Sequence, residues 1–554
     1  MTRLSSLLAS AALLLSARCA LSVTSQLFQL AGSTDGANNV KFSWDLIDGA
    51  AAYNIQQKAG SGSYATVATA PGNGYDVYGL SGSSSFQIEA INASNKTIDR
   101  SAELNVTATA GSGSNLAVYD NTVASSLKVK SKLKGSDGTH YRYGYVTDAD
   151  GFSHISQQTS KDGYTFEGDT QVLTKAEVCA STEDGNCKLE SINWAQNPKD
   201  GRVFMWAHFE RATDYGLGQV AVAYGTPGKN LTFGGAFRPG GDDSRDMTFF
   251  ADDDGAAYIV CAINTNTNLG LYALTADWTN VTSKVANLQP EEHREAPALI
   301  KNDGWYYLFT STAAGWYASQ GKYIAAQKLS GPWSASRNIG NLNTFGAQSG
   351  QVTKIGDNYI EAANRWAANW AHKEASHRQI LLPIATSGGV ASYHFYHHLN
   401  YDDDKGVVVP VQSGRILSVG QPANASVNGV NASLLNDGIQ DQDENLFSPG
   451  AAPFWWEVDL GADCAVTQID LTPRQVGGSE TYIQYNLTGS ADGKTWKTLV
   501  DEAANLSPGF RSPAVSDAGR FRYIRVNVHN VINVHNDQEA DWAAGLHEVT
   551  VYGD

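Results

Sequence analysis

Apolar and polar residues alternate along this chain in short runs that Gly, Pro, Asn and Asp interrupt. From residue 21 to about 110 such turns come roughly every 8–12 residues, which is typical of a β-sandwich. Val40–Trp44 and Ser85–Asn92 are two of the alternating strands. The N-terminal part is therefore predicted to be a small all-β domain that serves as a spacer and packs against its neighbour.

A second pattern, a glycine turn followed by an aromatic strand, recurs through the middle of the chain. In His293–Trp316 the turn Asn302-Asp303-Gly304 separates two apolar runs, which is a strong hairpin signal. The glycines of the five motifs lie 63, 54, 49 and 52 residues apart: Gly138, Gly201, Gly255, Gly304 and Gly356. Short strands repeating at about 50 residues indicate propeller blades, so five blades are predicted over 117–412.

The last region, residues 413–554, changes character again. Four of its segments read as the strands and turns of a second sandwich: Phe454–Gly461, Gly489–Trp496, Phe521–Val526 and Gly545–Tyr552. The predicted fold class is all-β, a five-bladed β-propeller flanked by sandwiches over 20–110 and 413–554, with a small-residue linker after Thr107. One of the adjacent Trp455 and Trp456 should point into the core, because neighbours on a strand face opposite ways.

Composition and charge narrow the possible partners. The chain has 554 residues, which predicts two to four domains. Its net charge is −17 and only 17% of its residues are charged. A phosphate backbone or an anionic membrane attracts a basic face, so the charge argues against nucleic acid and membrane partners. A neutral polysaccharide remains compatible with this composition.

The N-terminus predicts export. Residues 1–19 have a basic Arg3, an apolar run from Leu7 to Leu15 and an Ala17-Arg-Cys19 cleavage pattern, as in a signal peptide. No later run of about 18 apolar residues could span a membrane. Nine Asn-x-Ser/Thr sequons follow, at Asn92, Asn95, Asn105, Asn230, Asn280, Asn424, Asn431, Asn486 and Asn505. We expect a secreted, extracellular, glycosylated protein that is a monomer.

The cysteines give one expected disulfide. Cys179 and Cys187 flank a short polar loop and can pair, whereas Cys261 lies in an apolar strand and is expected to be a buried thiol. No Cys/His spacing of the metal-binding kind is present.

Sequence landmarks relate both flanking regions to known families. The N-terminal region resembles a fibronectin type III domain through Val40–Trp44, Ala52–Gln56, Tyr78–Leu80 and Ser85–Asn92. Residues 413–554 resemble a coagulation factor 5/8 type C (discoidin) domain, the fold of family 32 carbohydrate-binding modules.

The discoidin resemblance implies two sites. Arg474, in Leu471–Gln475, matches an arginine that binds galactose-type sugars, although Gly478–Thr481 replaces the usual Asn-Gly and the His expected near Phe447 is absent. A surface salt bridge is the alternative role for Arg474. Asp437, with its neighbours Asn436 and Gly438, and Glu548 match a structural Ca²⁺ site. An ordinary turn would explain the same residues.

The propeller region resembles glycoside hydrolase family 43, and within it the exo-β-1,3-galactanase branch. The motifs that carry the resemblance run in family order: Lys188–Glu190, Phe204–His208, Asp214–Gly216, Asp242–Asp246 with Asp252–Asp254, Arg294–Pro297, Ala314–Trp316 and Asn364–Trp366. It implies an inverting glycosidase that needs no cofactor for catalysis.

Inversion requires an acid and, about 6.5–9.5 Å away, a group that activates water. The resemblance makes Glu295 the acid and Asp246 the residue that raises its pKa. The alternatives are an ion pair with Arg294 for Glu295 and a turn role for Asp246.

The residue that activates the water is harder to assign from the sequence. Most of family 43 uses an Asp on the first inner strand, which is taken here as His140–Tyr145 and carries no carboxylate. The galactanase branch also lacks that Asp, and Gln348 matches the glutamine thought to hold the water there. Gln348 could instead be a hydrogen-bonding residue of the channel, and Asp148 is the fallback base.

Further residues are expected to contact the sugar. The resemblance assigns hydroxyl binding to Glu190 and stacking to Tyr215 and Trp316, with a loop ion pair and core packing as the alternatives. Tyr145 stands where the branch has a substrate-binding Glu, and Ala313 stands where it has Thr. Both changes put the sugar specificity in doubt.

The sequence thus predicts a secreted exo-glycosidase that removes galactose from β-1,3-galactan, such as that of arabinogalactan or plant cell walls. Another family 43 activity (β-xylosidase, α-L-arabinofuranosidase or galactofuranosidase) and a non-catalytic carbohydrate-binding protein are the alternatives. The enzymatic interpretation expects Glu295, Asp246 and Gln348 to face one cleft, with Glu295 and Gln348 far enough apart to admit a sugar and water.

Overall fold

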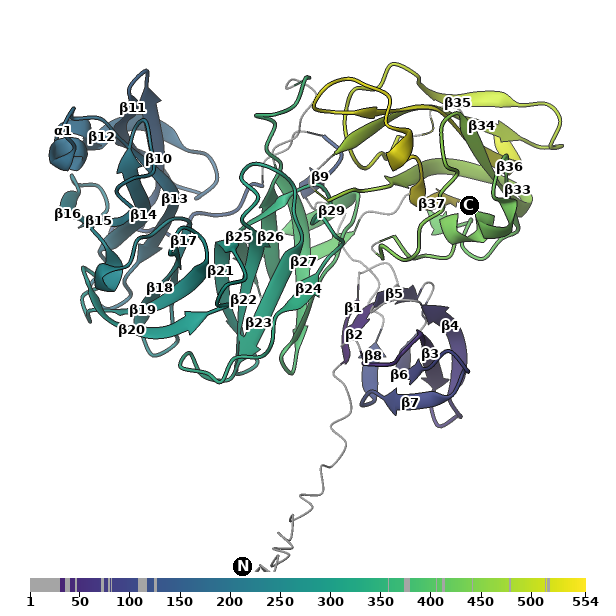
Figure 1. Ribbon diagram of the computed structural model, residues 1–554, viewed down its shortest axis with the longest axis horizontal. Coiled ribbons are helices and arrows are strands. Elements are labelled where there is room, and N and C mark those ends of the chain that lie inside the picture. Colours follow the sequence, from purple (N-terminus) through teal and green to yellow (C-terminus); the bar gives the residue numbers. More distant parts are fainter. Residues whose placement is uncertain are drawn as a thin grey trace, which may run out of the picture.

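The protein folds as three successive β-rich regions, shown in the computed structural model of Figure 1. The structure describes residues 30–34, 40–44, 47–70, 74–77, 80, 82–107, 117–123, 127–356, 358–372, 379–404, 406–410, 414–440, 442–477, 480–513, 515 and 519–554. The predicted signal peptide, the linker after Thr107 and the Gly478 position lie outside the described residues. No helix in these ranges is long and apolar enough to cross a membrane.

The N-terminal region is a two-sheet sandwich. Its strands are β1 (Leu30–Thr34), β2 (Val40–Trp44), β3 (Ala52–Ala59), β4 (Ala65–Ala70), β5 (Gly74–Val77), β6 (Ser83–Ile91), β7 (Thr97–Arg100) and β8 (Leu104–Thr107). One sheet has the order β1-β2-β5 and the other β4-β3-β6-β7, with β8 on β6. Phe42, Trp44 and Phe86 are buried in its core. The expected β-sandwich is present, and its kinship with fibronectin type III domains stays a prediction.

The central region contains five successive antiparallel sheets, of which the first has three strands and the others four. The strands are β10 (His140–Asp148), β11 (Gly151–Ser160), β12 (Glu167–Thr174); β13 (Cys187–Gln196), β14 (Val203–Arg211), β15 (Gln219–Gly225), β16 (Thr232–Phe237); β17 (Met247–Ala251), β18 (Ala257–Ile263), β19 (Asn268–Leu274), β20 (Val281–Leu288); β21 (Arg294–Asn302), β22 (Trp305–Thr312), β23 (Gly321–Ala326), β24 (Arg337–Ile339); β25 (Gln348–Ile355), β26 (Asn358–Asn364), β27 (Gln379–Ser387) and β28 (Val390–Tyr393). Each four-stranded sheet follows chain order, so every connection within it is short.

The repeated glycines are turn residues, as predicted. All five have a positive φ, between 57° and 87°, which side chains other than Gly adopt only with strain. Gly201, Gly255, Gly304 and Gly356 lie in the turns between the first and second strands of the four-stranded sheets. The aromatic strand after each turn is therefore the second strand. Phe204 and Trp206 on β14 illustrate why it is apolar on both faces, because they pack with β18 while Met205 packs with β11.

One strand assignment made from the sequence is wrong. β10 is the edge strand of its three-stranded sheet, but it follows the turn at Gly138 as the second strands of the four-stranded sheets follow theirs, so it corresponds to a second strand. The segment before that turn lies on its other side, where Tyr141 N donates to Leu133 O at 2.9 Å and Lys134 bridges His140. The inner-strand position predicted for His140–Tyr145 therefore differs from the place after the turn glycine that the repeat itself gives this motif.

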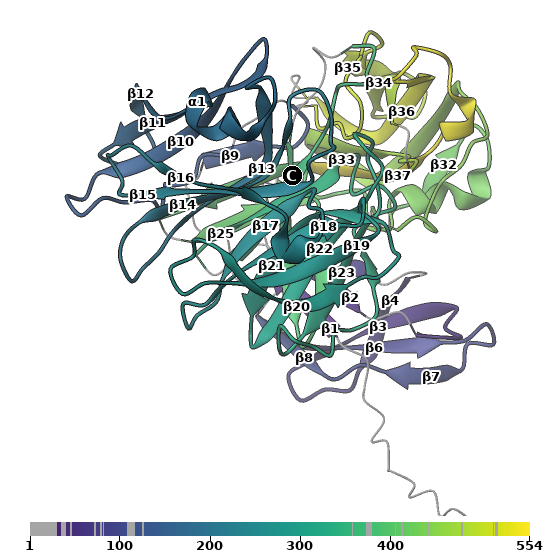
Figure 2. The ribbon, with the colours of Figure 1, turned by 60° about the vertical axis from the view of Figure 1, so that its left-hand side comes forward.

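The first strands of the four-stranded sheets lie next to one another. β17 contacts β13 and β21, and β21 contacts β25. Figure 2 shows β13, β17 and β21 toward the middle of the central region, with β14, β15 and β16 to their left and β19 and β23 to their right. A sixth sheet, β30-β29-β9, joins the two ends of the region through β9 (Ala117–Asp120), β29 (His398–Asp402) and β30 (Val407–Pro410).

The C-terminal region is a second sandwich. Its strands are β31 (Arg415–Ile416), β32 (Ala423–Ala425), β33 (Phe454–Pro473), β34 (Thr481–Ser490), β35 (Lys497–Glu502), β36 (Arg520–Asn533) and β37 (Leu546–Gly553). The long β33 pairs with β32 and β36 in its first half and with β37 in its second, so it passes from one sheet to the other. Burial alternates along Phe454–Leu460, with Trp456 buried and Trp455 half-buried, as predicted.

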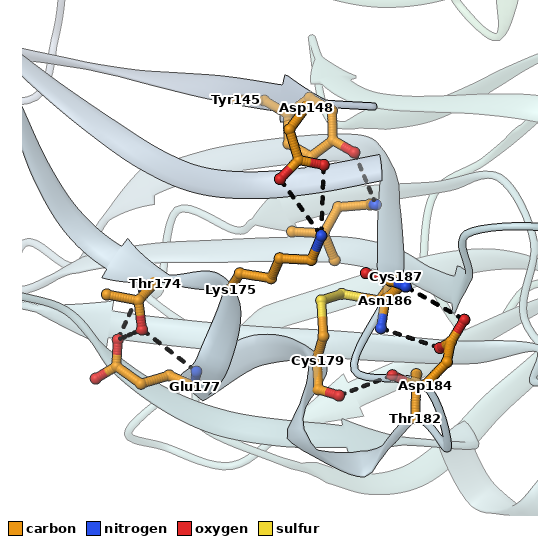
Figure 3. The surroundings of a disulfide bond; sticks show 11 residues. Tyr145, Asp148, Thr174, Lys175, Glu177, Cys179, Thr182, Asp184, Asn186 and Cys187 are labelled. Carbon is orange, nitrogen blue, oxygen red and sulfur yellow. Dashed lines mark hydrogen bonds and ion pairs between the residues drawn. A yellow bond between two sulfur atoms is a disulfide. The ribbon is translucent and has the colours of Figure 1, made fainter. Parts of the chain in front are cut away.

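Helical segments are few and short: α1 (Lys175–Val178), η1 (Cys179–Ser181), η2 (Pro239–Gly241), η4 (Gly429–Leu435) and η5 (Asp541–Ala543). The expected disulfide joins Cys179 to Cys187 beside α1, with Cα atoms 5.4 Å apart (Figure 3). Cys261 is a buried free thiol, as predicted, and Cys464 is also free and buried. Burial rules out one expected glycosylation site, because the Asn505 side-chain amide donates to two backbone carbonyls and is 6% exposed.

The three regions pack together. Phe510 of the C-terminal sandwich is fully buried in the core of the last central sheets, with its ring 3.8 Å from that of Phe395. Ile439, also from the C-terminal sandwich, belongs to the core cluster of the N-terminal one. Figure 1 shows the C-terminal sandwich beside β9 and β29 of the central region. The C-terminal sandwich therefore contacts both other regions.

Candidate active site

A cavity of about 690 Å³ opens where the first strands of the central sheets meet. Glu190 on β13, Asp246 just before β17, Glu295 on β21 and Gln348 on β25 all line it. Residues that are 158 positions apart in the sequence thus share one site, and the expectation of a single cleft is met for Glu295, Asp246 and Gln348.

A β-bulge follows each of three cavity residues. The strand register shifts between Glu190 and Asn193, between Glu295 and Ala298, and between Gln348 and Gln351. In two of these bulges a residue other than glycine has a positive φ, Ser191 at 47° and Ala296 at 48°. Bulges redirect side chains at the rims of sheets and beside active sites. The same distortion on three of the central sheets turns these side chains toward one cavity.

Glu295 is the least exposed of the three acidic residues Glu190, Asp246 and Glu295 in the cavity wall. It is 7% exposed, and its Oε1 and Oε2 accept hydrogen bonds from Gln348 Nε2 at 2.7 Å and Asn266 Nδ2 at 3.1 Å. Burial, and next the charge of Asp246, raise the pKa of Glu295 to about 8. The Arg294 guanidinium bonds to Thr310, Thr312 and Gln320 instead. Glu295 therefore keeps its proton at neutral pH, and the alternative role as a partner of Arg294 is not what the structure shows.

Asp246 lies between the strands that carry Glu190 and Glu295. Its Oδ1 accepts from Ser191 Oγ at 3.0 Å and its Oδ2 from Ala296 N at 3.1 Å. Both donors come from the bulges described above, so the bulges fix this carboxylate as well. Burial raises the pKa of Asp246, against the lowering effect of the Ser191 hydrogen bond and the charge of His208. In its ionised form Asp246 raises the pKa of Glu295, which is the role predicted for it.

The side chain of Gln348 is in direct contact with that of Glu295. Its Nε2 donates to Glu295, and its Oε1 accepts from Trp366 Nε1 at 2.7 Å. Both ends of the amide are therefore engaged, and the gap expected between Glu295 and Gln348 for a sugar and a water is absent. Sequence alone could not predict this contact, because the two residues lie on neighbouring sheets whose spacing sets the distance.

Glu190 lies in a contrasting environment. Its Oε1 accepts from Tyr215 Oη at 2.8 Å, and its Oε2 lies 3.4 Å from His208 Nδ1. Lys188 Nζ is 3.6 Å away. Burial alone would raise the pKa of Glu190, but the bonds from His208 and Tyr215 and the charges of His208 and Lys188 lower it overall. Glu190 is thus an ionised carboxylate whose side chain is 36% exposed, in the cavity wall.

His208 continues this network inward. It is 1% exposed, and its Nε2 lies 3.1 Å from Glu210 Oε1. Burial lowers the pKa of His208, but its bonds to Glu190 and Glu210 outweigh that effect and raise it. Glu210 also accepts from the backbone N–H groups of Leu217 and Gly218. A carboxylate, an imidazole and a second carboxylate therefore form a chain that ends in the cavity.

The aromatic residues of the site have different roles. Trp316 and Trp366 line the cavity and are 53% and 40% exposed, so their rings can stack against a sugar. Tyr215 also lines the cavity, but Lys188 Nζ lies 3.4 Å and the Arg245 guanidinium 5.1 Å from its ring centre, so sugar stacking on this ring stays a prediction. Its hydroxyl orients Glu190.

Three predicted residues do not line the cavity. Tyr145 accepts from Leu189 N at 3.4 Å and stacks on Phe152, as follows from the second-strand position of β10. Asp148, the fallback base, is exposed and lies 3.3 Å from Lys175 Nζ beside the disulfide (Figure 3). Arg474 lies in the C-terminal sandwich, where its Nη1 donates to Trp542 O at 2.8 Å. Trp542 itself is 50% exposed.

The predicted calcium residues are close together. Gly438 N donates to Glu548 Oε2 at 3.3 Å, and both Asp437 oxygens accept from Asn445 Nδ2. Burial raises the pKa of Asp437 to about 6. Among the described residues, no group of three or more His, Cys, Asp or Glu side chains could hold a metal ion. A calcium ion here would need backbone and amide oxygens as well, so the site stays a prediction.

Sequence reasoning missed several cavity residues. Asn266 lies in a turn whose three residues from Asn264 have positive φ, and nothing in the turn itself marks it as a partner of Glu295. His208 closes a family motif, Phe204–His208, but it is on an apolar strand, where a histidine is usually part of the core. Trp366 stood in a family motif, Asn364–Trp366, and that motif could have placed it at the site.

Comparison with known proteins assigns the class. A model described as glycosyl hydrolases family 43 matches residues 120–378, and one described as a NedA-like, galactose-binding domain matches residues 435–526. No curated protein matches the chain. The protein is a glycosidase, and it contains a family 43 domain followed by a domain of the galactose-binding type.

Solved structures agree on the fold. An exo-β-1,3-galactanase from Phanerochaete chrysosporium, solved as a variant with β-1,3-galactotriose, is 21% identical with a TM-score of 0.51. The alignment covers 77% of this chain and 100% of that one. The same enzyme with galactose is 22% identical with a TM-score of 0.50, over 77% of this chain and 100% of that one. At such identity the likeness concerns the fold.

Proposed function

We propose that the protein is an inverting exo-β-1,3-galactanase that releases galactose from β-1,3-galactan. The observation that carries the proposal is the pair of contrasting carboxyl groups in one cavity, a protonated Glu295 and an ionised Glu190. The galactan specificity rests on the likeness in fold to the exo-β-1,3-galactanase from Phanerochaete chrysosporium. The galactose-binding type of the C-terminal domain agrees with it.

The acid step uses Glu295. A protonated carboxyl group donates its proton to the glycosidic oxygen as the bond to the anomeric carbon breaks, so the leaving sugar departs as a neutral alcohol. A pKa of about 8 keeps this proton in place at neutral pH. The Asp246 carboxylate maintains that raised pKa, and the hydrogen bond from Asn266 orients the carboxyl group.

The water step needs a group that can accept a proton. The geometry favours Glu190 over Gln348, because Glu190 is charged and Gln348 already bonds to both Glu295 and Trp366. Glu190 would take a proton from the water that attacks the anomeric carbon, while His208, itself bonded to Glu210, stabilises the charged form of Glu190. Gln348, the residue that the family resemblance suggests, stays the second candidate. In either case the product is the α-anomer of the released sugar.

The five central sheets would then form the five blades of a propeller. Two observations support this closure: the adjacent first strands, and the β30-β29-β9 sheet that joins the two ends of the region. Secretion, glycosylation and a structural calcium at Asp437 and Glu548 belong to the same proposal. They rest on the sequence and on the short distances at the Asp437 site.

A different sugar is the second enzymatic candidate. Ala313 lines the cavity where the galactanase branch has Thr, so a sugar hydroxyl there would lack a partner. A β-xylosidase, arabinofuranosidase or galactofuranosidase would use the same two carboxyl groups. A purely carbohydrate-binding protein would need no residue with a raised pKa beside a second carboxylate, and Glu295 counts against that interpretation.

The test is to incubate the full-length protein with β-1,3-galactan, xylan and arabinan and to follow the released sugars by NMR. We expect α-galactose as the first product, and none from the Glu295→Gln variant. Release of a pentose would overturn the galactan assignment, and β-galactose as the first product would overturn inversion. No product from any glycan, with binding retained, would leave the binding-protein interpretation.

A further inference from the structure

The segments on either side of the Gln348–Trp366 contact are held by the C-terminal sandwich. Gln348 begins β25, and Asn364, which pairs with it, ends β26. The loop 341–347 runs into Gln348, and the segment 365–372 follows Asn364. Both segments contact the C-terminal sandwich. This domain therefore touches the backbone next to two cavity residues, which a separate sugar-binding tail would not do.

Arg365 is the central residue of this contact. It is 2% exposed; its Nε donates to Gly346 O at 3.0 Å and its Nη1 to Pro508 O at 3.5 Å. One guanidinium thus links the backbone two residues before Gln348 to the backbone of the C-terminal sandwich. Burial lowers the pKa of Arg365 to about 10, against the opposing charge of Glu480, so it stays charged at neutral pH.

Two glycines leave the space that Arg365 fills. Gly346 on the loop and Gly509 on the C-terminal sandwich have φ values of 75° and 77°. A Cβ added at either would lie 3.0 Å from Arg365 Nη2. Each position therefore combines a backbone conformation that favours glycine with a close approach of the guanidinium, which indicates a socket that fits this side chain closely.

Other contacts fix the same two segments. Asn343 Nδ2 donates to Gln475 Oε1 at 3.2 Å, and the Phe345 ring lies 5.9 Å from that of Phe510. Beyond Trp366, Ala371 N donates to Val534 O at 2.7 Å, and Trp370 is buried against Tyr482 and Val534. The residues before and after the Gln348–Trp366 pair are thus both anchored in the C-terminal sandwich.

We propose that the C-terminal sandwich is part of the catalytic machinery, and that Arg365 is the positioning residue through which it holds Gln348 against Glu295. The consequence for catalysis rests on the proposed function, whereas the positioning itself does not. A loop released from Arg365 would let Gln348 withdraw from Glu295. The acid would then lose one of its two hydrogen bonds from side chains, and misplacement of an orienting group by about 1 Å can cost about a hundredfold in rate.

The test compares full-length variants. Arg365→Lys keeps the charge but replaces the planar fork with a point donor, which cannot reach both carbonyl groups in the same way. Gln475→Ala removes the bond to Asn343 from the other side of the contact, and it serves if Arg365→Lys does not fold. Arg522→Lys is the matched control, because Arg522 makes two 2.7 Å bonds to Asp459 within the C-terminal sandwich.

The first readout is hydrogen–deuterium exchange of the segment 341–352, which needs no enzymatic activity. We expect exchange there to rise at least about tenfold in Arg365→Lys, less in Gln475→Ala, and not in Arg522→Lys, with exchange around Asp246 unchanged. Unchanged exchange in both interface variants would overturn the proposal. If the wild type cleaves no glycan, the proposed function fails, and this readout still decides the positioning role.

The second readout is the pH dependence of kcat/KM. The Gln348 hydrogen bond lowers the pKa of Glu295, so its loss should move the basic limb to higher pH while kcat falls about tenfold to a hundredfold. The charged groups that act on Glu295, Asp246 before β17 and Arg294 on β21, are unaltered in these variants. A lower yield of folded enzyme would scale the rate without moving the limb. An unmoved limb with raised exchange would overturn the link to catalysis.

Discussion

Glu295 and Glu190 are the same kind of side chain in the same cavity, yet their surroundings push their pKa values in opposite directions. Glu295 is buried beside Asp246 and has no cation bonded to it. Glu190 has His208, Tyr215 and Lys188 around it. At any pH between the two pKa values, Glu295 carries a proton and Glu190 does not. An inverting hydrolase needs such a division of labour, and the environment alone produces it.

The comparison also shows how the backbone contributes. Both residues precede a bulge on the first strand of a sheet, and both bulges donate a hydrogen bond to Asp246. Asp246 thereby connects the strand of Glu190 with the strand of Glu295. Its charge raises the pKa of Glu295, and a hydrogen bond from Ser191, next to Glu190, holds its position.

The largest expected effect is the loss of the acid. Glu295→Gln keeps the shape and removes the proton, so kcat on galactan should fall about a thousandfold or more. The matched control is Glu291→Gln, an exposed glutamate four residues earlier, which should leave kcat unchanged. A Glu295→Gln enzyme with more than about a tenth of the wild-type rate would contradict the assignment.

The second effect separates two roles for Glu190. If Glu190 activates water, Glu190→Gln should lower kcat about a hundredfold to a thousandfold with little change in KM. A rise in KM with kcat preserved would mean that Glu190 only binds sugar hydroxyls, the role that the sequence predicted. Steady-state kinetics on a β-1,3-galactan oligosaccharide give both constants.

The third effect is the pH profile of the wild type. Activity requires Glu295 protonated, so kcat/KM should fall as pH rises through about 8. It also requires Glu190 ionised, so the acid limb should lie below 4.5, the ordinary glutamate value, because the pKa of Glu190 is lowered. A broad plateau between these limits is expected. A basic limb near pH 5 would contradict the raised pKa of Glu295.

The smallest effect concerns Asp246. Asp246→Asn removes the charge that raises the pKa of Glu295, so the basic limb should move to lower pH by about one unit. Asp253→Asn, at an exposed aspartate that pairs with Lys301, is the control and should not move it. An upward shift would show that the hydrogen bonds of Asp246, and not its charge, control the acid.

The sequence predicted the elements well where local chemistry decides them. The turn glycines have the positive φ that the motif implies, and the Cys179–Cys187 disulfide and the alternating burial around Trp456 are present. Tyr145 was placed wrongly because an aromatic strand reads the same at the first and second positions of a sheet. The difference depends on which strand of a sheet lies next to the first strands of the neighbouring sheets, and no local pattern encodes that.

Contacts between sheets were out of reach for the same reason. Gln348 and Glu295 are 53 residues apart, and only the spacing of β21 and β25 brings their side chains to 2.7 Å. The cations over Tyr215 and the link from Arg365 to Pro508 likewise join segments whose proximity no local pattern encodes. Resemblance to a family supplied the residues of the site, but it did not supply their mutual distances.

The most direct test of the division of labour is chemical rescue with azide. Glu190→Ala and Gln348→Ala variants are incubated with a β-1,3-galactan oligosaccharide and azide, and the products are analysed by NMR. If Glu190 activates the water, azide occupies its place and yields α-galactosyl azide with recovered rate in Glu190→Ala, and not in Gln348→Ala. Rescue of Gln348→Ala alone would contradict the account and assign the water to the amide.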